Sequence, residues 1–358
     1  MPSDSSRRTS LFLLALLTLV GLVTGACGGG GSSGDGGGTP AQDAAPVTVR
    51  LGYFPNVTHA TAIVGVEKGI FQEKLGTDKL EVSTFNAGPA AVEALFSEAL
   101  DATYVGPNPA INAFVKSRGE AIRIISGATS GGAALVVQPE IADAADLAGK
   151  KVASPQLGGT QDVALRSWLK DNGLKTTPEG GGDVSVVPQE NSQTVETFKS
   201  RDIAGAWVPE PWATRLVSEG GGKVLVDEAT LWPKGEFVTT HLVVRTKFLQ
   251  KHPGAVARLL DGQVAANAFI AANVGEAQSL VNHGIEKVTS KRLADSVIAA
   301  AWKNLHFTND PIAASLATSA KHAEDIGLLE KVDLDGIYDL GPLNAVLRKA
   351  GEKEVPNP

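Results

Sequence analysis

Short apolar segments typical of strands alternate along most of the chain with longer segments whose apolar residues recur at helical spacing. The first pair is 47–53 (VTVRLGY), which predicts a strand, and 60–69, which predicts a helix. The same patterns predict strands at 80–85, 101–105, 122–126, 133–137, 150–153, 183–187, 203–208 and 224–226, and helices at 89–100, 109–117, 160–172, 192–200 and 211–220. Such alternation is typical of parallel βαβ units, in which helices cover both faces of a sheet.

Two blocks of this alternation predict an α/β fold of two lobes, between which the chain crosses near residues 137 and 240. The strand predicted at 241–245 returns to the first lobe, and the remainder to Leu347 is strongly helical. The predicted boundaries are 46–137 and 241–358 for the first lobe and 138–240 for the second. A cleft between two lobes is a natural site for a small ligand and allows hinge closure around it.

The first 26 residues have the features of a secretory signal peptide. Arg7 and Arg8 precede an apolar run at 11–23, and small residues follow before Cys27. This run is too short to cross a bilayer as a helix, which takes about 20 residues. We therefore predict that residues 1–26 direct export and are removed.

Cys27 is the only cysteine of the chain, and the residues before it, Val23-Thr24-Gly25-Ala26, resemble a lipobox. We expect Cys27 to become the N-terminal residue and to carry lipid, which anchors the protein at the extracytoplasmic face of the cell membrane. The alternative is an ordinary secretory signal with an incidental cysteine. Residues 27–45 are then a flexible Gly-rich linker, because this stretch has almost no large apolar residue to bury.

Composition excludes several classes of function. The net charge is −7, and no basic face suggests nucleic-acid binding. The chain has no GxSxG, HExxH or phosphate-binding GxxxxGK[ST] motif, so an enzyme is not expected. One cysteine and six scattered histidines favour neither a metal site nor a cofactor.

Four segments carry a resemblance to a known family. They are 85–89 (FNAGP), 106–109 (GPNP), 154–162 (SPQLGGTQD) and 207–212 (WVPEPW). They resemble the nitrate/sulfonate/taurine group of substrate-binding proteins of ABC importers, over about residues 46–345. The resemblance implies a periplasmic-binding-protein fold of type II, a ligand in the cleft between the lobes, and no catalysis.

Three of the predicted helix starts are candidate oxyanion sites. The first N–H groups of a helix lack internal partners and lie at the positive end of its dipole, so they can bind a sulfonate, nitrate or carboxylate. We expect Asn108 to cap a helix that begins at Pro109, which leaves the N–H of Ala110 free. The other candidates are Gly88 and Pro89 at one helix start and Gly158, Gly159, Thr160 and Gln161 at another. For each, a helix start without a ligand is the alternative.

Further candidates lie in loops at strand ends. Asn56, Thr58 and His59 follow the first strand, at the edge where open α/β sheets bind ligands. Acidic residues at the place of Glu210 commonly face the cleft in the family, where a carboxylate would pair with an amine and repel a bare anion. His241, at the second crossing, is a further candidate. The alternatives are that Glu210 lies on the surface and that His59 is simply a residue at a helix start.

These observations predict an extracytoplasmic solute-binding protein of an ABC importer. We expect a small anionic or zwitterionic solute of the sulfonate or taurine type, a membrane permease as partner, and a monomer. Within the same fold, the alternatives are a nitrate, bicarbonate or pyrimidine-precursor binder. A surface lipoprotein without a transport role is a further alternative, and an enzyme of this fold would work in the cytoplasm.

Overall fold

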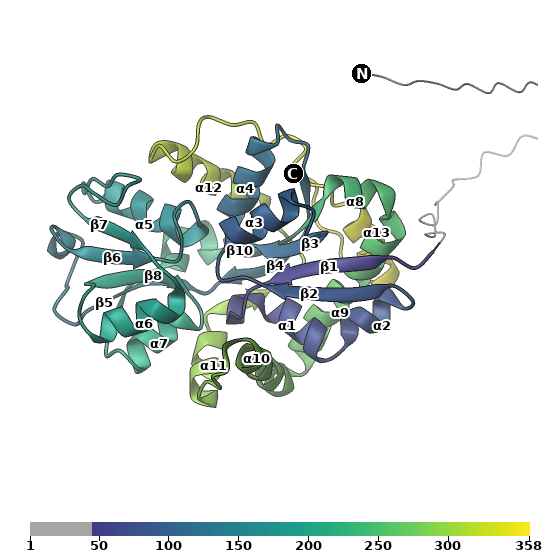
Figure 1. Ribbon diagram of the computed structural model, residues 1–358, viewed down its shortest axis with the longest axis horizontal. Coiled ribbons are helices and arrows are strands. Elements are labelled where there is room, and N and C mark those ends of the chain that lie inside the picture. Colours follow the sequence, from purple (N-terminus) through teal and green to yellow (C-terminus); the bar gives the residue numbers. More distant parts are fainter. Residues whose placement is uncertain (1–44) are drawn as a thin grey trace, which may run out of the picture. The chain divides into compact units, whose positions relative to one another are not determined.

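The computed structural model describes residues 45–358, and its strands form two sheets. In this part of the chain, a six-stranded sheet has the order β11-β4-β10-β3-β1-β2 and a five-stranded sheet the order β7-β6-β8-β5-β9. Figure 1 shows the five-stranded sheet with α5 to α7 on the left and the six-stranded sheet on the right. The predicted signal peptide, Cys27 and the linker up to residue 44 lie outside the described residues.

The first lobe contains the six-stranded sheet and most of the helices. Its strands are β1 (Thr48–Tyr53), β2 (Lys79–Thr84), β3 (Ala102–Val105), β4 (Ile122–Gly131), β10 (Val238–Arg245) and β11 (Leu305–Phe307). Its helices are η1 (Val57–His59), α1 (Ala60–Glu67), α2 (Ile70–Leu75), α3 (Gly88–Phe96), α4 (Pro107–Lys116), α8 (Thr246–Lys251), α9 (Pro253–Ala272), α10 (Val274–Thr289), α11 (Asp295–Trp302), α12 (Ala313–Asp325) and α13 (Gly341–Ala350).

The second lobe is smaller. Its strands are β5 (Ala133–Val137), β6 (Lys151–Ser154), β7 (Ser185–Pro188), β8 (Gly205–Pro209) and β9 (Lys223–Asp227). Its helices are η2 (Ala145–Leu147), α5 (Thr160–Asp171), α6 (Asn191–Lys199), α7 (Trp212–Ser218), η3 (Glu228–Leu231) and η4 (Pro233–Gly235). The alternation of strands and helices predicted from the sequence is therefore present in both lobes.

The sheets are mixed, whereas the alternating pattern suggested parallel units. Strand β10 pairs antiparallel with β3 and β4, and β5 pairs antiparallel with β8 and β9. Strands β5 and β10 lie where the chain enters one lobe from the other, so it runs against the local strand direction, and β11 at the edge of the first sheet is also antiparallel to β4. Apolar patterning marks a buried strand but carries no information about its direction.

The first crossing lies at Gly131 and Gly132, earlier than the boundary at residue 137. Strand 133–137 pairs with β8 and β9 of the second sheet, so the assignment of this segment to the first lobe was wrong. Both glycines have positive φ, 80° and 76°, which turns the chain out of β4. A Cβ at Gly132 would lie 2.2 Å from Cδ2 of Leu305. The chain returns to the first sheet at Val238, where β10 begins.

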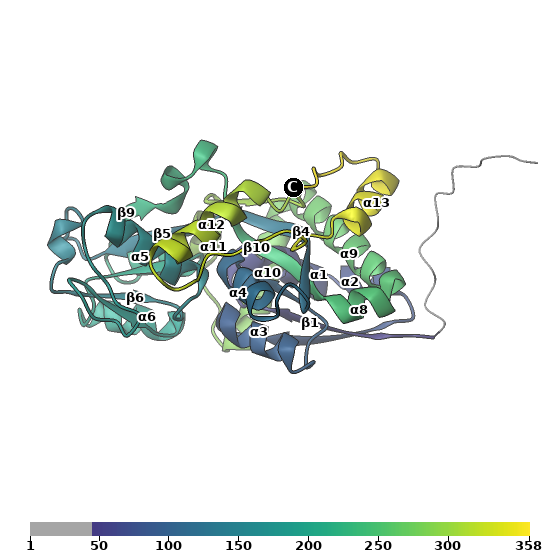
Figure 2. The same cartoon turned by 90° about the horizontal axis from the view of Figure 1, so that it is seen from above.

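Each sheet is covered by helices on both faces. In the first lobe, α1, α9 and α10 contribute to one apolar cluster, and α3, α4 and α12 to the other. In the second lobe, α6 and α7 cover one face and α5 the other. Helix α12 also packs on α5 of the second lobe, whereas α13 packs on α9 (Figure 2). Among the described residues, every helix is too short or too polar to cross a membrane.

A buried carboxylate lies where the second sheet ends. Glu228 is only 2% exposed and accepts a hydrogen bond from Nε1 of Trp207 at 2.7 Å and another from Trp232. The Trp232 ring stacks on Phe237 beside the second crossing. Burial raises the pKa of Glu228 from 4.5 to about 7, although the indole hydrogen bonds oppose this shift.

This pKa predicts a stability profile that depends on pH. Between pH 4.5 and about 7 the folded protein binds more protons at Glu228 than the unfolded chain, so the free energy of unfolding falls as pH rises. The shift corresponds to roughly 3 kcal/mol. Glu228→Gln keeps an acceptor for Trp207 but has no group that titrates, so we expect its free energy of unfolding not to fall in this way. Chemical denaturation should therefore show that the stability of the variant relative to the wild type increases from pH 4.5 to 8. The exposed control Glu352→Gln should have a stability profile parallel to that of the wild type, and a parallel profile for Glu228→Gln would contradict this prediction.

Candidate solute-binding site

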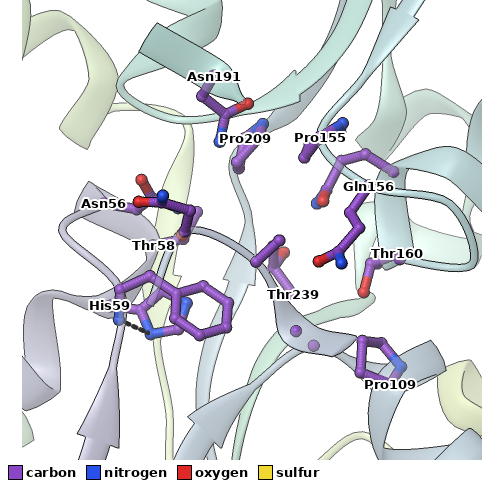
Figure 3. A pocket seen from close by; sticks show the side chains of 17 residues that line it. Asn56, Thr58, His59, Pro109, Pro155, Gln156, Thr160, Asn191, Pro209 and Thr239 are labelled. Carbon is purple, nitrogen blue, oxygen red and sulfur yellow. Dashed lines mark hydrogen bonds between the residues drawn. The ribbon is translucent and has the colours of Figure 1, made fainter. Parts of the chain in front are cut away.

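A small cavity of about 40 Å³ lies between the two lobes. In Figure 3, Asn56, Thr58 and His59 lie on one side of it, with Gln156 and Thr160 opposite. The first lobe contributes Phe54, Asn56, Thr58, His59, Asn86, Ala87, Gly88, Gly106, Pro109 and Thr239, and the second lobe Pro155, Gln156, Gly159, Thr160, Gln161, Asn191 and Pro209. The predicted candidates Asn56, Thr58, His59, Gly88, Pro109, Gly159, Thr160 and Gln161 are thus brought together.

Two helix starts face one another across this cavity. Helix α3 begins at Gly88 and α5 begins at Thr160, and neither has a side-chain cap. Apart from Pro89, which has no N–H, their first residues therefore carry N–H groups that lack a partner in the helix and can donate to a ligand. Since both helix dipoles have their positive ends here, the cavity favours a group with negative charge. Pro89, the second residue of α3, does not line the cavity.

The start of α4 differs from the prediction. The helix begins at Pro107 with Gly106 as its N-cap, and the N–H of Ala110 is already bonded to the Gly106 carbonyl at 3.3 Å. Asn108 is buried and its Nδ2 donates to the Ser319 carbonyl at 3.1 Å, so the expected cap was wrong. Pro107 and Pro109 have no N–H. The first turn of α4 can therefore offer no more than the N–H of Asn108, and Pro109 lines the cavity with its ring alone.

Asp162 shapes the loop before α5. Its carboxylate is fully buried and accepts hydrogen bonds from Ser154 Oγ at 2.7 Å, the Gly158 N–H at 3.0 Å and Arg166 Nε at 3.0 Å. The N–H of Gly158 is thereby used within the protein, and Gly158 does not line the cavity as predicted. Because Arg166 compensates the charge of Asp162, the loop presents Gly159, Thr160 and Gln161 without a free carboxylate.

The loop after β1 supplies uncharged donors. Nδ1 of His59 accepts the N–H of Phe54 at 3.3 Å, and the two rings lie 4.3 Å apart. Burial lowers the pKa of His59 to about 3, so the ring is neutral near pH 7 and carries its proton on Nε2. Asn56 Oδ1 accepts from Trp212 Nε1 at 2.7 Å, which leaves the amide N–H groups of Asn56 as donors. The Thr58 carbonyl accepts from the hydroxyl groups of Thr129 and Thr240, which hold the loop in place.

Glu210 lies outside this cavity. Its carboxylate accepts from the Thr214 N–H and hydroxyl at 3.1 and 3.0 Å and from Asn304 Nδ2 at 2.8 Å. It borders a separate pocket beside α7, β9 and α11. Burial raises the pKa of Glu210, and these hydrogen bonds oppose the shift. The structure therefore places Glu210 outside the cavity that holds the other candidates, where Thr214 and, from a segment distant in sequence, Asn304 bind its carboxylate.

His241 is a core residue. It lies in β10 opposite Val105 and Gly127 and has no exposed surface. Its Nε2 is 3.1 Å from the Pro311 carbonyl, and burial lowers the pKa of His241 to about 4. The structure therefore gives His241 a packing role, since the crossing lies three residues earlier than predicted.

Sequence reasoning missed several lining residues. Asn191 opens α6 directly after β7, a strand–loop–helix pattern like the three that were recognised. Asn86, Gly106 and Gln156 lie within the recognised segments but were not singled out. Thr239 reaches the cavity from the second crossing, and no local signal marks it.

The lining of this cavity has no Lys, Arg, Asp or Glu. Donors come instead from helix starts, amides, hydroxyl groups and a neutral imidazole. Such a set can hold an oxyanion through hydrogen bonds while excluding water. Within residues 45–358, no group of three or more His, Cys, Asp or Glu side chains is placed to hold a metal ion.

A two-lobe α/β fold that encloses a small polar cavity between helix starts defines a solute-binding protein of the periplasmic type. The chain belongs to the NMT1-like family, whose model matches residues 42–283. This confirms the resemblance inferred from its sequence segments.

Relatives and solved structures agree with this class. A Brucella abortus (strain 2308) relative named as a binding protein is 29% identical over 230 residues, 63% of this chain and 68% of the relative. The taurine-binding periplasmic protein of Escherichia coli (strain K12) is 29% identical over 189 residues, 53% of this chain and 57% of that protein. The structure of the periplasmic nitrate-binding protein NrtA from Synechocystis PCC 6803 matches with a TM-score of 0.73 at 16% identity, covering 85% of this chain and 89% of that one.

The lobes touch directly at Gly106. A Cβ at this position would lie 2.2 Å from Oγ1 of Thr160, which belongs to the other lobe. Gly106 has a φ of −72°, so alanine fits its backbone, and the contact with Thr160 opposes a side chain more strongly than the Thr239 carbonyl, which would lie 3.3 Å from the Cβ. Gly106 therefore allows the closed arrangement.

We predict that Gly106→Ala holds the lobes apart. Overpacking of this kind costs roughly 1–3 kcal/mol, so the closed form should become about tenfold less populated. Small-angle X-ray scattering should give a larger radius of gyration for Gly106→Ala than for the control Gly275→Ala, whose Cβ meets no atom within 4 Å. Adding Thr160→Ala to Gly106→Ala should return the radius of gyration to that of the control. An unchanged radius in Gly106→Ala would contradict the close contact.

Proposed function

We propose that this chain is the solute-binding component of an ABC importer and binds a small oxyanion of the sulfonate type between its lobes. The observation that carries this proposal is the meeting of the uncapped starts of α3 and α5 at one cavity without a carboxylate in its lining. The similarity to a taurine-binding periplasmic protein supports the same solute class.

Binding, without catalysis, is the proposed activity. The solute enters between separated lobes, and closure brings the α5 start and Gln156 against it. The closed form is then recognised by a permease, and the ATPase of the importer supplies the energy. We further propose that Cys27 carries a lipid anchor at the extracytoplasmic face of the membrane and that the protein acts as a monomer.

Bicarbonate or nitrate is a second candidate, favoured by the size of the cavity. About 40 Å³ leaves room for only a few non-hydrogen atoms, so a larger sulfonate needs the lobes to open slightly. Both anions would use the same helix starts and amide donors.

Thermal shift with taurine, ethanesulfonate, nitrate, bicarbonate and a neutral pyrimidine tests the proposal. A solute present at about 100-fold its dissociation constant should raise the free energy of unfolding by roughly 2.7 kcal/mol. We expect stabilisation by at least one of the anions or taurine and none by the neutral compound. If no anion raises the melting temperature, the proposed function is wrong.

Glu210→Gln should leave the preference between taurine and ethanesulfonate unchanged. These sulfonates differ in an ammonium group, and the Glu210 carboxylate is bound by Thr214 and Asn304 outside the cavity. An ammonium paired with a buried carboxylate would lose roughly 2 kcal/mol or more on this substitution. Calorimetric titration of both solutes measures the ratio of affinities, and a selective loss for taurine would contradict the geometry.

A further inference from the structure

A larger groove of about 440 Å³ adjoins the cavity on the seam between the lobes. Asn86 lines both spaces. The first lobe contributes the end of α10 and Lys291 to the groove, and the second lobe contributes Trp212 and Arg215. A solute at the groove is therefore separated from the cavity by little more than the side chains at the seam.

Two hydrogen bonds between the lobes close this seam. Trp212 Nε1 donates to Asn56 Oδ1 at 2.7 Å, and Asn86 Nδ2 donates to Glu190 Oε1 at 2.7 Å. Each bond joins the first lobe to the second, and in each the asparagine lines the cavity. Separation of the lobes breaks both bonds together and joins the groove to the cavity.

Arg215 provides a cation with an unused donor at the groove. It is only 5% exposed, and its Nε and Nη2 donate to the two oxygens of Glu219 at 2.7 and 3.1 Å. Its guanidinium lies 4.9 Å from the centre of the Trp212 ring. Within residues 45–358, Nη1 has no hydrogen-bond partner. A buried guanidinium with a free N–H is a ready donor for an anion.

Two lysines add positive charge at the same place. Lys199 Nζ and Lys291 Nζ lie 3.5 and 3.9 Å from Glu219 Oε2, and Lys199 also contacts Glu196 at 3.5 Å. Of the charged side chains that line the groove, Arg215 and Lys291 are cations and Glu196 is a carboxylate, so the lining is net positive on a chain whose net charge is −7. Since the cavity lining has no charged side chain, the formal charges that attract a distant anion lie outside the cavity.

We propose that this groove is a first binding site for the anionic solute, which is held at Arg215 and Lys291 before it passes between Asn56 and Trp212 into the cavity. This inference rests on the proposed function and adds an entrance site with a separate role. The groove attracts the anion by charge, and the cavity recognises it by hydrogen bonds. Charge at the groove then governs the association rate more than the dissociation rate.

The test is stopped-flow binding of ethanesulfonate and nitrate, followed by tryptophan fluorescence, in the wild type and Lys291→Glu. Lys291 is 58% exposed, so its replacement should leave folding intact. At 10 mM ionic strength, where the Debye length is about 30 Å, we expect the association rate constant to fall about three- to tenfold. At 1 M, where this length is about 3 Å, the difference should vanish, and the dissociation rate constant should be unchanged. The matched control is Lys247→Glu, an equally large charge change at an 86% exposed lysine away from the groove.

Equal association rates in Lys291→Glu and Lys247→Glu at low salt would overturn the entrance site while leaving the proposed function intact. Absence of any anion binding by the wild type would overturn both. Arg215→Gln provides a second measurement. We expect the variant to associate with an anion more slowly than the wild type. We also expect a saturating concentration of the solute to raise the melting temperature of the variant by as much as that of the wild type. Faster dissociation alone in Arg215→Gln would show that it belongs to the final site and would also overturn the inference.

Discussion

The approach of Gly106 to Thr160 across the cavity is the contact on which the rest of the site depends. A hydroxyl of one lobe occupies the space where any side chain of the other would lie. With this contact made, the starts of α3 and α5 face one another, and the loops after β1 and β6 complete the walls. Without it, each lobe would expose a few unpaired N–H groups to water, which competes for them.

Two buried acidic residues near this site are engaged elsewhere. Asp162 is held by Arg166 and Ser154, and Glu210 by Thr214 and Asn304. Buried carboxylates are costly unless hydrogen-bonded or paired, and these partners also turn the charges away from the cavity. A cavity that is neutral in its side chains and positive in its helix dipoles follows from this arrangement.

Recognition and attraction are therefore separated in space. Neutral donors at fixed positions select a ligand by geometry, because each buried donor left without an acceptor costs free energy. Formal charges at the adjoining groove act over longer distances and need less exact placement. The two hydrogen bonds at the seam lie between these spaces, so lobe motion connects them.

Local patterning determined the elements of this protein. Every strand except β11, most helices, the two-lobe organisation and the segments around Asn56, Gly88 and Thr160 were predicted, because burial periodicity and helix-start residues are local properties. The sequence could not decide strand direction, the crossing at Gly132, or the side on which Glu210 and His241 lie. Glu210 was placed in the cleft because its neighbours resemble a family motif, but Asn304 binds it from a segment far along the chain.

Tertiary structure also decided which helix starts keep a free donor. At α4 the sequence correctly indicated a helix start, but the helix begins two residues earlier than predicted. The N–H of Ala110 is therefore bonded within the helix, and the first turn contains two prolines. Thr239 and Asn191 became cavity residues only through the closing of the lobes. Composition and periodicity report what each segment prefers, whereas a binding site depends on which segments meet, and that is set by packing between residues far apart in the chain.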